Sequence, residues 1–452
     1  MFKKVLIANR GEIARRIIRT CKRLNIQTVA VYSEADAEAL HVREADEAYC
    51  IGKPPVAHSY LNIERILEVA HESNAEAIHP GYGLLSENAD FARRCTEAGF
   101  VFIGPSAKVI ASMGSKLEAR KTMKAAGVPI VEGVEAPVKD AAEAIEIASR
   151  IGYPIMLKAS AGGGGIGMQL VESAEELAKA FEGNQKRAQS FFGDGTMYME
   201  RFIANPHHVE VQIIADHDGN VVPLFERECS IQRRNQKVVE EAPSPFISEE
   251  TRMRMLDVSV QAVQHIGYVN AGTIEYLVDA DQNFYFLEMN TRLQVEHPVT
   301  EEITKLDLVE EQLKVAAKQS LSFTRDSIKK HGHAIEVRIY AENPTTFFPS
   351  PGKITELELP IGEGIRHECG VEAGSTVTPF YDPMISKLVV WGETRAIACE
   401  RLTQALANYK IEGIQTNIPM LLKTVTHEQF LKGSTTTKFV EEYYLPQLEE
   451  MK

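Results

Sequence analysis

The chain has 452 residues, of which 44% are hydrophobic and 25% charged, a profile typical of a globular protein with two or three domains. A formal net charge of −14 argues against a nucleic-acid surface, which requires concentrated basic residues. No apolar run approaches a membrane span and the first residues do not resemble a signal peptide, so we expect a cytoplasmic protein. The six cysteines are dispersed without a C-x-x-C pair, which predicts reduced thiols and neither disulfides nor zinc.

The first part of the chain alternates strand and helix patterns in the order of a doubly wound parallel sheet, which predicts a domain over residues 1–113. The predicted strands are KVLIAN, QTVAVY, AEAIHP and FVFIGP, and the predicted helices are EIARRIIRTCKRL, ERILEVAHESN and ENADFARRCTEAG. The first strand–helix turn, ANRGE, has too few glycines for a dinucleotide fingerprint. We therefore interpret the domain as a scaffold whose strand ends, including residues 79–88 (HPGYGLLSEN), approach a substrate. A purely structural loop is the alternative.

Residues 158–171, KASAGGGGIGMQLV, contain Gly162, Gly164 and Gly167 and match the G-x-G-x-x-G template. A strand pattern precedes the glycines, but a second short apolar strand follows them, and a helical pattern starts only at SAEELAKAF. This order predicts strand, glycine flap and strand, and not a dinucleotide-binding turn. Such a flap can lay backbone N–H groups over phosphates, whereas a flexible hairpin tip is the alternative from the glycines alone.

The middle region, residues 114–332, mixes helices and strands as one α+β unit, and GTIEYLVD and FYFLEMN predict a hairpin within it. If the second strand stays extended beyond Asn290, its alternation places five polar residues on one face: Glu288, Asn290, Arg292, Gln294 and Glu296. An edge strand with one wet face is the alternative. Glu275 on the partner strand adds a second carboxylate, and this oxygen-rich set suits Mg²⁺ bound to a nucleotide.

Three lysines in separate segments are candidate phosphate cations, although a single lysine is more often a solvated surface residue: Lys116, Lys158 and Lys237. Lys158 is the strongest candidate because it lies in an apolar strand beside the glycine flap. The chain has no G-x-x-x-x-G-K-[ST], so a P-loop is excluded. Short strands dominate residues 333–452 until a late helix at ETRAIACERLTQALANY, which predicts a mainly β segment.

Long strings across nearly the whole chain resemble one family, the biotin carboxylases, which are the ATP-grasp components of biotin-dependent carboxylases. These strings are KVLIANRGEIA, HPGYGLLSEN, GGGGIGM, ECSIQRRNQKVVEEAP, EMNTRLQVEHPVTE, PSPGKI and YDPMISKLV. The resemblance implies an α/β and α+β fold in three domains. They are a Rossmann-like pre-ATP-grasp domain (1–113), an ATP-grasp domain (114–332) with a mobile lid at about 131–203, and a mainly β C-terminal biotin carboxylase domain (333–452).

Position by position, the resemblance also implies the site residues. The ATP phosphates would meet Lys116, Lys158, Gly164, Gly165 and His208. The rest of the nucleotide site would comprise Glu200, Arg201, Phe202, Ile203, Gln232 and Asn235. Glu275 and Glu288 would contact ATP and hold the metal, with Asn290 nearby. The bicarbonate and biotin site would comprise Lys237, Arg292, Gln294, Val295, Glu296 and Arg338, of which Lys237, Arg292, Glu296 and Arg338 would be catalytic.

The implied reaction is the ATP- and bicarbonate-dependent carboxylation of biotin through carboxyphosphate, with Mg²⁺ or Mn²⁺, giving carboxybiotin, ADP and phosphate. Glu296 would act as general base toward bicarbonate, and Arg338 would stabilise the enolate oxygen of biotin. No lysine has the Met-Lys-Met setting of a biotin attachment site and no carboxyltransferase region is present. We therefore expect a separate biotin carboxyl carrier protein and carboxyltransferase subunits. The usual setting would be acetyl-CoA carboxylase of fatty acid biosynthesis, and the usual assembly a homodimer.

Two positions depart from the family pattern. Ile166 stands where the family usually has arginine, and Asn235 stands where it usually has histidine. Both changes remove a cation or proton carrier beside the nucleotide, so we expect altered ATP affinity or lid behaviour and retained chemistry. Two alternative functions follow: another ATP-grasp ligase, which would lack NTRLQVEHP with Arg338, and a regulatory subunit that binds ATP without bicarbonate-dependent hydrolysis.

Overall fold

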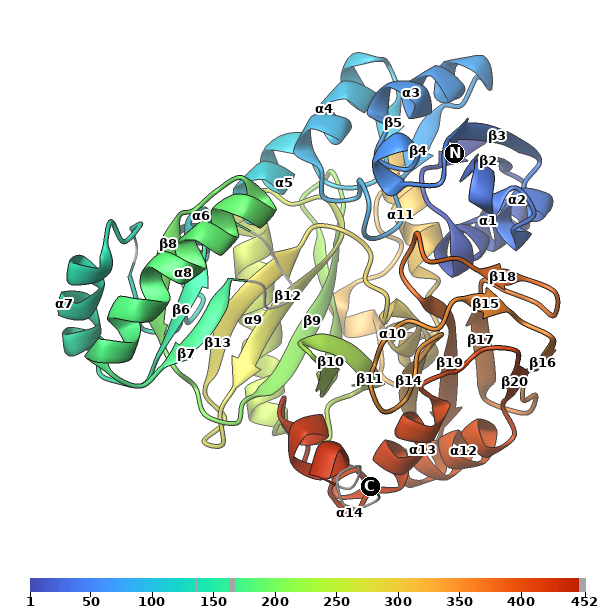
Figure 1. Cartoon of the computed structure of the whole chain (residues 1–452). Helices are drawn as coiled ribbons and strands as arrows, with labels where there is room; N and C mark the ends of the chain where they lie inside the picture. The colour runs from blue at the N-terminus through green and yellow to red at the C-terminus, as the bar shows by residue number, and fades with distance from the viewer. Residues whose placement is uncertain (135, 162–166, 447–452) are drawn as a thin grey trace.

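The computed structural model describes residues 1–134, 136–161 and 167–446, and Figure 1 shows it coloured along the chain. The N-terminal part is a parallel sheet, as predicted, and it has five strands in the order β3-β2-β1-β4-β5, of which β3 was not predicted. Val5 and Ile7 pack against α1, whereas Leu6 packs against α3 and α4 on the opposite face, so the sheet is covered on both sides. Its elements are β1 (Lys4–Ile7), α1 (Gly11–Arg23), β2 (Gln27–Ser33), α2 (Leu40–Glu44), β3 (Glu47–Gly52), α3 (Ile63–Glu72), β4 (Ala77–His79), α4 (Ala89–Glu97), β5 (Val101–Phe102) and α5 (Ala107–Gly114).

A small layer at the left of Figure 1 consists of a three-stranded sheet, β7-β6-β8, with α7 and α8 packed on it, and we call these elements the lid. β6 pairs antiparallel with β7, which confirms the predicted strand on each side of the glycines. Of those glycines, Gly162, Gly164 and Gly165, with Ile166, lie outside the described residues. The lid elements are α7 (Ala141–Ile151), β6 (Ile155–Ala159), β7 (Met168–Val171), α8 (Ala174–Phe192) and β8 (Met197–Arg201).

The centre of the molecule is an eight-stranded sheet in the order β13-β12-β9-β10-β11-β14-β19-β17. β14 pairs with β11 on one side and with β19 on the other, so strands from both sides of residue 332 form one sheet. The strands are β9 (His207–Ala215), β10 (Val221–Arg233), β11 (Gln236–Ala242), β12 (Asn270–Val278), β13 (Phe284–Asn290), β14 (His333–Tyr340), β17 (Ile365–Cys369) and β19 (Met384–Gly392).

Helices pack on both faces of this sheet. The helices α6 and α9 bury an apolar face of β9, β12 and β13, while α12 and α13 bury one face of β14 and β19. α10 packs on β11, β14 and β19. The bounds are α6 (Lys116–Ala125), α9 (Glu249–Ile266), α10 (His297–Thr304), α11 (Leu308–Ala316), α12 (Arg395–Ala407), α13 (Ile418–Thr426), α14 (Glu428–Leu431) and a π-helix (Val440–Tyr444).

The remaining strands form two short antiparallel pairs in the sheet-rich C-terminal part: β15 (Gly352–Lys353) with β18 (Thr376–Val377), and β16 (Glu356–Glu358) with β20 (Lys410–Glu412). All six cysteines are unpaired, as predicted, and all but Cys50 are buried. Among the described residues, no helix combines the length and apolarity needed to span a bilayer.

The predicted hairpin is confirmed, with Glu275 opposite Glu288, but its second strand ends earlier than the alternation argument assumed. β13 ends at Asn290, and an irregular segment leads to α10, which begins at His297. The extended row through Glu296 is therefore wrong as a conformation. Pro298 in the first turn of α10 is one reason, because proline is well suited to a helix start.

Candidate active site

A cavity of about 520 Å³ lies between the lid and the eight-stranded sheet. The lid contributes Met156, Lys158 and Met168 to its wall. Most residues that the sequence analysis selected line it together: Lys116, Lys158, Glu200, Arg201, Phe202, Ile203, His208, Gln232, Asn235, Lys237, Glu275, Glu288, Asn290, Arg292, Gln294, Val295 and Arg338. Glu296 is fully buried and reaches this set through Lys237 and Arg338. Gly164 and Gly165 lie outside the described residues.

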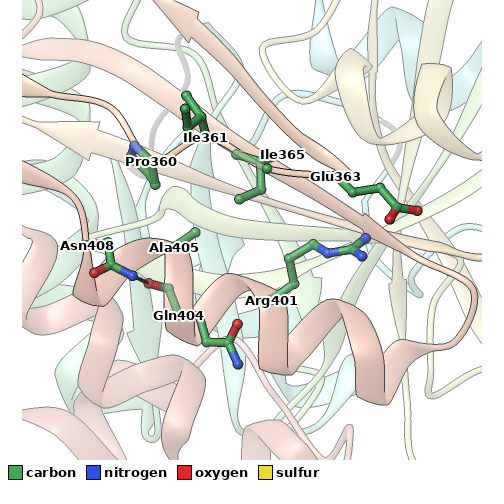
Figure 2. A pocket seen from close by; sticks show the side chains of 9 residues that line it. Pro360, Ile361, Glu363, Ile365, Arg401, Gln404, Ala405 and Asn408 are labelled. Atoms are coloured by element: carbon green, nitrogen blue, oxygen red, sulfur yellow. Dashed lines mark hydrogen bonds between the residues drawn. The ribbon is translucent and has the colours of Figure 1, made fainter.

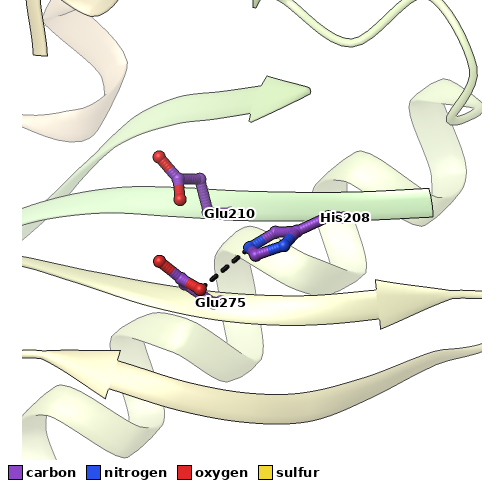
Figure 3. Close-up of side chains that lie close together, drawn as sticks. All are labelled: His208, Glu210 and Glu275. Atoms are coloured by element: carbon purple, nitrogen blue, oxygen red, sulfur yellow. Dashed lines mark ion pairs between the residues drawn. The ribbon is translucent and has the colours of Figure 1, made fainter. Parts of the chain in front are cut away.

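Strand alternation on β9 explains why polar groups gather at this cavity. Val209 and Val211 lie in the apolar cluster formed with α9, and the residues between them therefore face the opposite side of the sheet. There Glu210 lies opposite Glu275 of β12 in the antiparallel register. Figure 3 shows His208, Glu210 and Glu275 side by side on these two strands. The apolar face of these strands thus belongs to the core, and their polar face belongs to the site.

The ammonium group of Lys237 is at the centre of the polar face. Its Nζ donates to Glu210 Oε2 at 2.5 Å, to Glu275 Oε1 at 2.7 Å and to Glu296 Oε1 at 2.7 Å. Burial alone would lower the pKa of Lys237, but the attraction of these three carboxylates raises it well above its usual value. Lys237 is therefore a permanent cation that holds three carboxylates from different segments together.

Glu296 joins Lys237 to Arg338. Its Oε2 accepts from Arg338 Nη2 at 3.0 Å, while Oε1 accepts from Lys237. Burial alone would raise the pKa of Glu296, but Lys237, Arg338 and Arg227 hold it well below its usual range. Glu296 is thus an ionised proton acceptor flanked by two cations, an arrangement that can hold a small anion and take a proton from it.

The donor set around Glu275 and Glu288 fits a divalent cation. The two carboxylates occupy paired positions on β12 and β13, and Asn290 Nδ2 donates to Glu275 Oε1 at 2.8 Å. Burial and the neighbouring charge of Glu275 raise the pKa of Glu288, although Lys116 opposes this shift. A second cation beside Glu288 would relieve that repulsion, and hard carboxylate and amide oxygens are the ligands that Mg²⁺ prefers.

Arg292 is fixed on three sides at the rim of the cavity. Its guanidinium donates to Glu87 Oε2 at 2.9 Å, to Gln294 Oε1 at 2.6 Å and to Asn290 Oδ1 at 2.8 Å. Gln294 in turn donates to Glu275 Oε1 at 2.9 Å. Glu87 belongs to the segment 79–88, so this part of the N-terminal domain does approach the site.

Lys158 is buried in the wall formed by the lid, where its ammonium group contacts the carboxylate of Glu200. Arg120 contacts the other oxygen of Glu200 and donates to the Val131 carbonyl at 2.9 Å. Because the two cations Lys158 and Arg120 share the single carboxylate of Glu200, the three groups together carry a net positive charge beside the cavity. That charge is consistent with the phosphate-binding role predicted for Lys158.

The other predicted nucleotide residues surround this wall. His208 Nε2 lies 2.8 Å from Glu275 Oε2, and its Nδ1 lies 2.9 Å from Gln232 Nε2. Burial lowers the pKa of Lys116, the first residue of α6, against the opposing effect of Glu288. Asn235 is exposed in the turn between β10 and β11 with a φ of +62°, a conformation that asparagine tolerates well.

A second cavity, of about 340 Å³, borders the site on the side of the N-terminal domain. Arg292, Val295 and Arg338 line both cavities. The second cavity adds Tyr82 and Glu12, whose side chains contact each other. Arg292, Val295 and Arg338 thus face two neighbouring cavities.

Several residues of the site were not predicted from the sequence: Arg120, Glu87, Glu210, Arg227 and Lys387. Arg227 is fully buried and donates to Glu210 at 2.6 Å, and Lys387 Nζ donates to the Val295 carbonyl at 2.6 Å. The alternation of polar and apolar residues in HHVEVQIIA, which places His208, Glu210 and Gln212 on one face of the strand, was the available signal. Nothing local marked Arg120 or Lys387, because their partners are distant in the chain.

Three family profiles match the chain in succession. They are the biotin carboxylase N-terminal domain over residues 1–110, the carbamoyl-phosphate synthase L chain ATP-binding domain over residues 115–324, and the biotin carboxylase C-terminal domain over residues 336–442.

Relatives match over nearly the full length. Biotin carboxylase 2 of Bacillus subtilis is 62% identical over 98% of this chain and 100% of its own, and the biotin carboxylase of Halalkalibacterium halodurans is 63% identical over 97% of each chain. One similar solved structure is the biotin carboxylase domain dimer of 2-oxoglutarate carboxylase from Hydrogenobacter thermophilus, in complex with MgADP, ADP and bicarbonate. Its TM-score is 0.96 at 49% identity, and the match covers 99% of this chain and 98% of that chain. The biotin carboxylase of Campylobacter jejuni, in complex with an ATP compound, has a TM-score of 0.96 at 45% identity, with coverage of 98% and 99%.

Proposed function

The chain belongs to the biotin carboxylase family, and we propose that the cleft around Lys237 is the place where ATP and bicarbonate carboxylate biotin. The protein is an ATP-dependent ligase whose reaction uses ATP, Mg²⁺ and bicarbonate. The observation that carries the residue assignment is the chain of contacts from Glu275 through Lys237 and Glu296 to Arg338, because it joins the phosphate side of the cavity to the biotin side.

Phosphoryl transfer to bicarbonate needs positioning and charge neutralisation more than covalent help from the protein. Lys116 and Lys158 supply positive charge at the nucleotide side of the cavity. Glu275 and Glu288 would hold Mg²⁺ with Asn290 nearby, and the ion when bound supplies Lewis-acid neutralisation of the phosphate oxygens. Arg201, Phe202, Ile203 and Gln232 line the remaining nucleotide wall. For Gly164 and Gly165, which lie outside the described residues, the phosphate-binding role stays a prediction from the resemblance.

Bicarbonate is held beside Glu296 by Arg292 and the backbone of Val295, which Lys387 fixes through the Val295 carbonyl. Glu296 accepts the bicarbonate proton as the oxygen attacks the γ-phosphate, and Lys237 balances the charge that develops. Carboxyphosphate then yields CO₂ and phosphate. Phosphate removes the N1′ proton of biotin, and Arg338 stabilises the enolate oxygen until that nitrogen captures CO₂.

ADP release with and without free biotin tests this assignment. Mg²⁺-ATP with bicarbonate is expected to give slow ADP release that biotin stimulates, and Glu296→Gln is expected to lower the stimulated rate by at least about 100-fold. Glu302→Gln, on the helix that begins beside Glu296, is the matched control and keeps the wild-type rate. Equal stimulation in Glu296→Gln and wild type would refute the role of Glu296.

We also propose a homodimer, supported by the dimer of the Hydrogenobacter relative. Figure 2 shows the cavity of about 360 Å³ beside α12, where Ile361 is 91% exposed. We propose that a partner chain buries this side chain in the dimer. Light scattering is expected to give the mass of two chains, and Ile361→Asp the mass of one. A single-chain mass for the wild type contradicts the proposal.

The partners are proposed by the same reasoning: a biotin carboxyl carrier protein delivers biotin, and carboxyltransferase subunits consume carboxybiotin, with acetyl-CoA carboxylase as the setting. Purification of the protein from its own cells, followed by streptavidin detection of biotin, tests the carrier. Identification of the acyl-CoA that completes the reaction tests the setting. A cytoplasmic location stays a prediction that cell fractionation checks.

A further inference from the structure

Two fully buried carboxyl groups without an assigned role lie behind Arg338. Glu240 of β11 and Glu336 of β14 are directly paired across the antiparallel register, and both are 0% exposed. Side chains at such positions have Cβ atoms about 5 Å apart. Glu240 Oε1 accepts from Arg338 Nε at 2.6 Å. Within the described part of the chain, Glu240 Oε2 and both oxygens of Glu336 have no hydrogen-bond partner.

The positively charged groups near Glu240 and Glu336 are too few to neutralise both carboxyl groups if both are ionised. Arg338 lies beside the pair on β14, Lys387 on the neighbouring β19 and Lys237 on β11. α10 packs over all three strands and brings Glu296 at its N-cap and His297, whose pKa burial holds well below its usual value. Lys237 and Arg338 are already shared with Glu296, so two further charges in this position would be underpaired.

We propose that Glu240 and Glu336 share a single proton and act as positioning residues that hold Arg338, so that the pair and Arg338 together are neutral and not negative. The shared proton joins one unpartnered oxygen of each carboxyl group by a hydrogen bond and reduces the charge of the pair from −2 to −1. Burial raises the pKa of Glu240 to about 7, with Glu296 adding to the effect and Arg338 opposing it. Burial likewise raises the pKa of Glu336 well above its usual value.

The consequence for the reaction rests on the proposed role of Arg338. Such a pair titrates in two steps, and the second step removes the shared proton. Above that pH the doubly charged pair and Arg338 together carry a net charge of −1, which weakens the stabilisation of the enolate oxygen of biotin by Arg338. The kcat/KM for free biotin is therefore expected to fall above neutral pH. The groups that titrate are Glu240 and Glu336, which do not line the cavity.

Glu336→Gln is the informative variant, because an amide opposite Glu240 keeps the pair at −1 and cannot lose a proton. The alkaline limb of kcat/KM for free biotin is expected to move upward by at least about one pH unit. Glu240→Gln keeps an acceptor oxygen for Arg338 Nε but removes the negative charge that holds the guanidinium, and it is expected to raise the KM for biotin more than it lowers kcat. Glu226→Gln is the matched control, since Glu226 is a buried carboxylate paired with Arg252 and away from Arg338.

Infrared spectroscopy of the full chain supplies a readout that a structural role would not move. At neutral pH the C=O stretching band of a protonated carboxyl group is expected in the wild type and in Glu226→Gln, with lower intensity in Glu336→Gln and Glu240→Gln. An unchanged band in both of the latter variants, or an unmoved alkaline limb in Glu336→Gln, overturns the proposal. Absence of biotin-stimulated turnover in the wild type would instead refute the proposed function, and the band would still report on the pair.

Discussion

Lys237 shows how one buried cation organises the site at the scale of a residue. Its ammonium group holds Glu210, Glu275 and Glu296, which come from three separate segments. Lys237→Met leaves these carboxylates without their shared partner, so turnover is expected to fall by at least about 100-fold. The free energy of unfolding is expected to fall by about 3 to 5 kcal/mol, as for other broken buried ion pairs. ADP release and chemical denaturation measure the two effects.

Lys179→Met is the matched control for this substitution. Lys179 lies on α8 with an exposed side chain and a neighbouring Glu175, so its replacement is expected to change neither rate nor stability measurably. Turnover of Lys237→Met at the wild-type rate would contradict the central role assigned to that cation.

Asn235→His restores the residue type usual in the family. Histidine tolerates the left-handed φ of +62° at this turn, so the substitution is expected to preserve the fold. It adds a potential cation at the cavity, so the KM for ATP is expected to decrease while kcat stays within about threefold. Steady-state kinetics at several ATP concentrations provide the measurement. Identical values in both proteins would mean that position 235 does not influence the nucleotide.

Most residues that line the cavity were selected from the family resemblance, which rests on long sequence strings. These residues lie in separate segments of the chain and meet in one cavity. The partners of those residues were harder to predict. Glu200 meets Arg120 from α6, and Arg292 meets Glu87 from the N-terminal domain. Each pair joins residues far apart in sequence, and spacing carries no information about such contacts until the fold is known.

At the scale of elements, the lid tests the link between backbone conformation and ATP binding. Gly167 has a φ of +78°, its carbonyl accepts from Ala159 N at 2.9 Å, and an added Cβ would lie 2.8 Å from Ala159 Cβ. Gly167→Ala is therefore expected to strain the end of the glycine flap by about 1 to 3 kcal/mol. The KM for ATP is expected to rise severalfold in steady-state assays.

Gly183→Ala is the control in the same part of the molecule. Gly183 lies within α8, where an added Cβ meets no atom within 4 Å. Alanine is the better helix former, so stability is expected to rise by up to about 1 kcal/mol with an unchanged KM for ATP. A wild-type KM for ATP in Gly167→Ala would show that the flap tolerates the strain.

Periodicity predicted most elements but not where they end. The segment after Asn290 keeps an alternating pattern of polar residues, yet it is irregular and leads into α10. Its polar side chains still converge, because Gln294, Asn290 and Lys237 all donate to Glu275. Hydrogen bonds between distant segments therefore determine the conformation after Asn290. A local sequence pattern does not predict such hydrogen bonds. The helices α2, α5, α11, α13 and α14 also went unpredicted.

At the scale of the whole molecule, a charge network joins the N-terminal and C-terminal parts. Glu368 of β17 accepts from Arg19 of α1 at 2.5 Å and lies 2.7 Å from Arg366. Burial alone would raise the pKa of Glu368, but Arg366, Arg19 and Arg16 lower it to about 2. The unfolded pKa is about 4.3, so Glu368 contributes up to about 3 kcal/mol above that pH. This contribution is lost as pH falls toward about 2.

Glu368→Gln is expected to flatten the dependence of stability on pH in this window. Melting temperatures measured from about pH 5 to about pH 3 are expected to fall less steeply than those of the wild type. Glu175→Gln, on the exposed face of α8, is the control and keeps the wild-type slope. If the melting temperatures of Glu368→Gln and wild type fell equally steeply with pH, Glu368 would not be the source of the loss of stability in acid.

The proposed reaction transfers carbon from bicarbonate to biotin in this cleft. The most direct measurement incubates the protein with Mg²⁺-ATP, free biotin and isotopically labelled bicarbonate, and then isolates carboxybiotin. Label is expected in carboxybiotin in proportion to biotin-dependent ADP release, and it is expected to be lost in Glu296→Gln. Biotin-dependent ADP release without label in biotin would contradict the account.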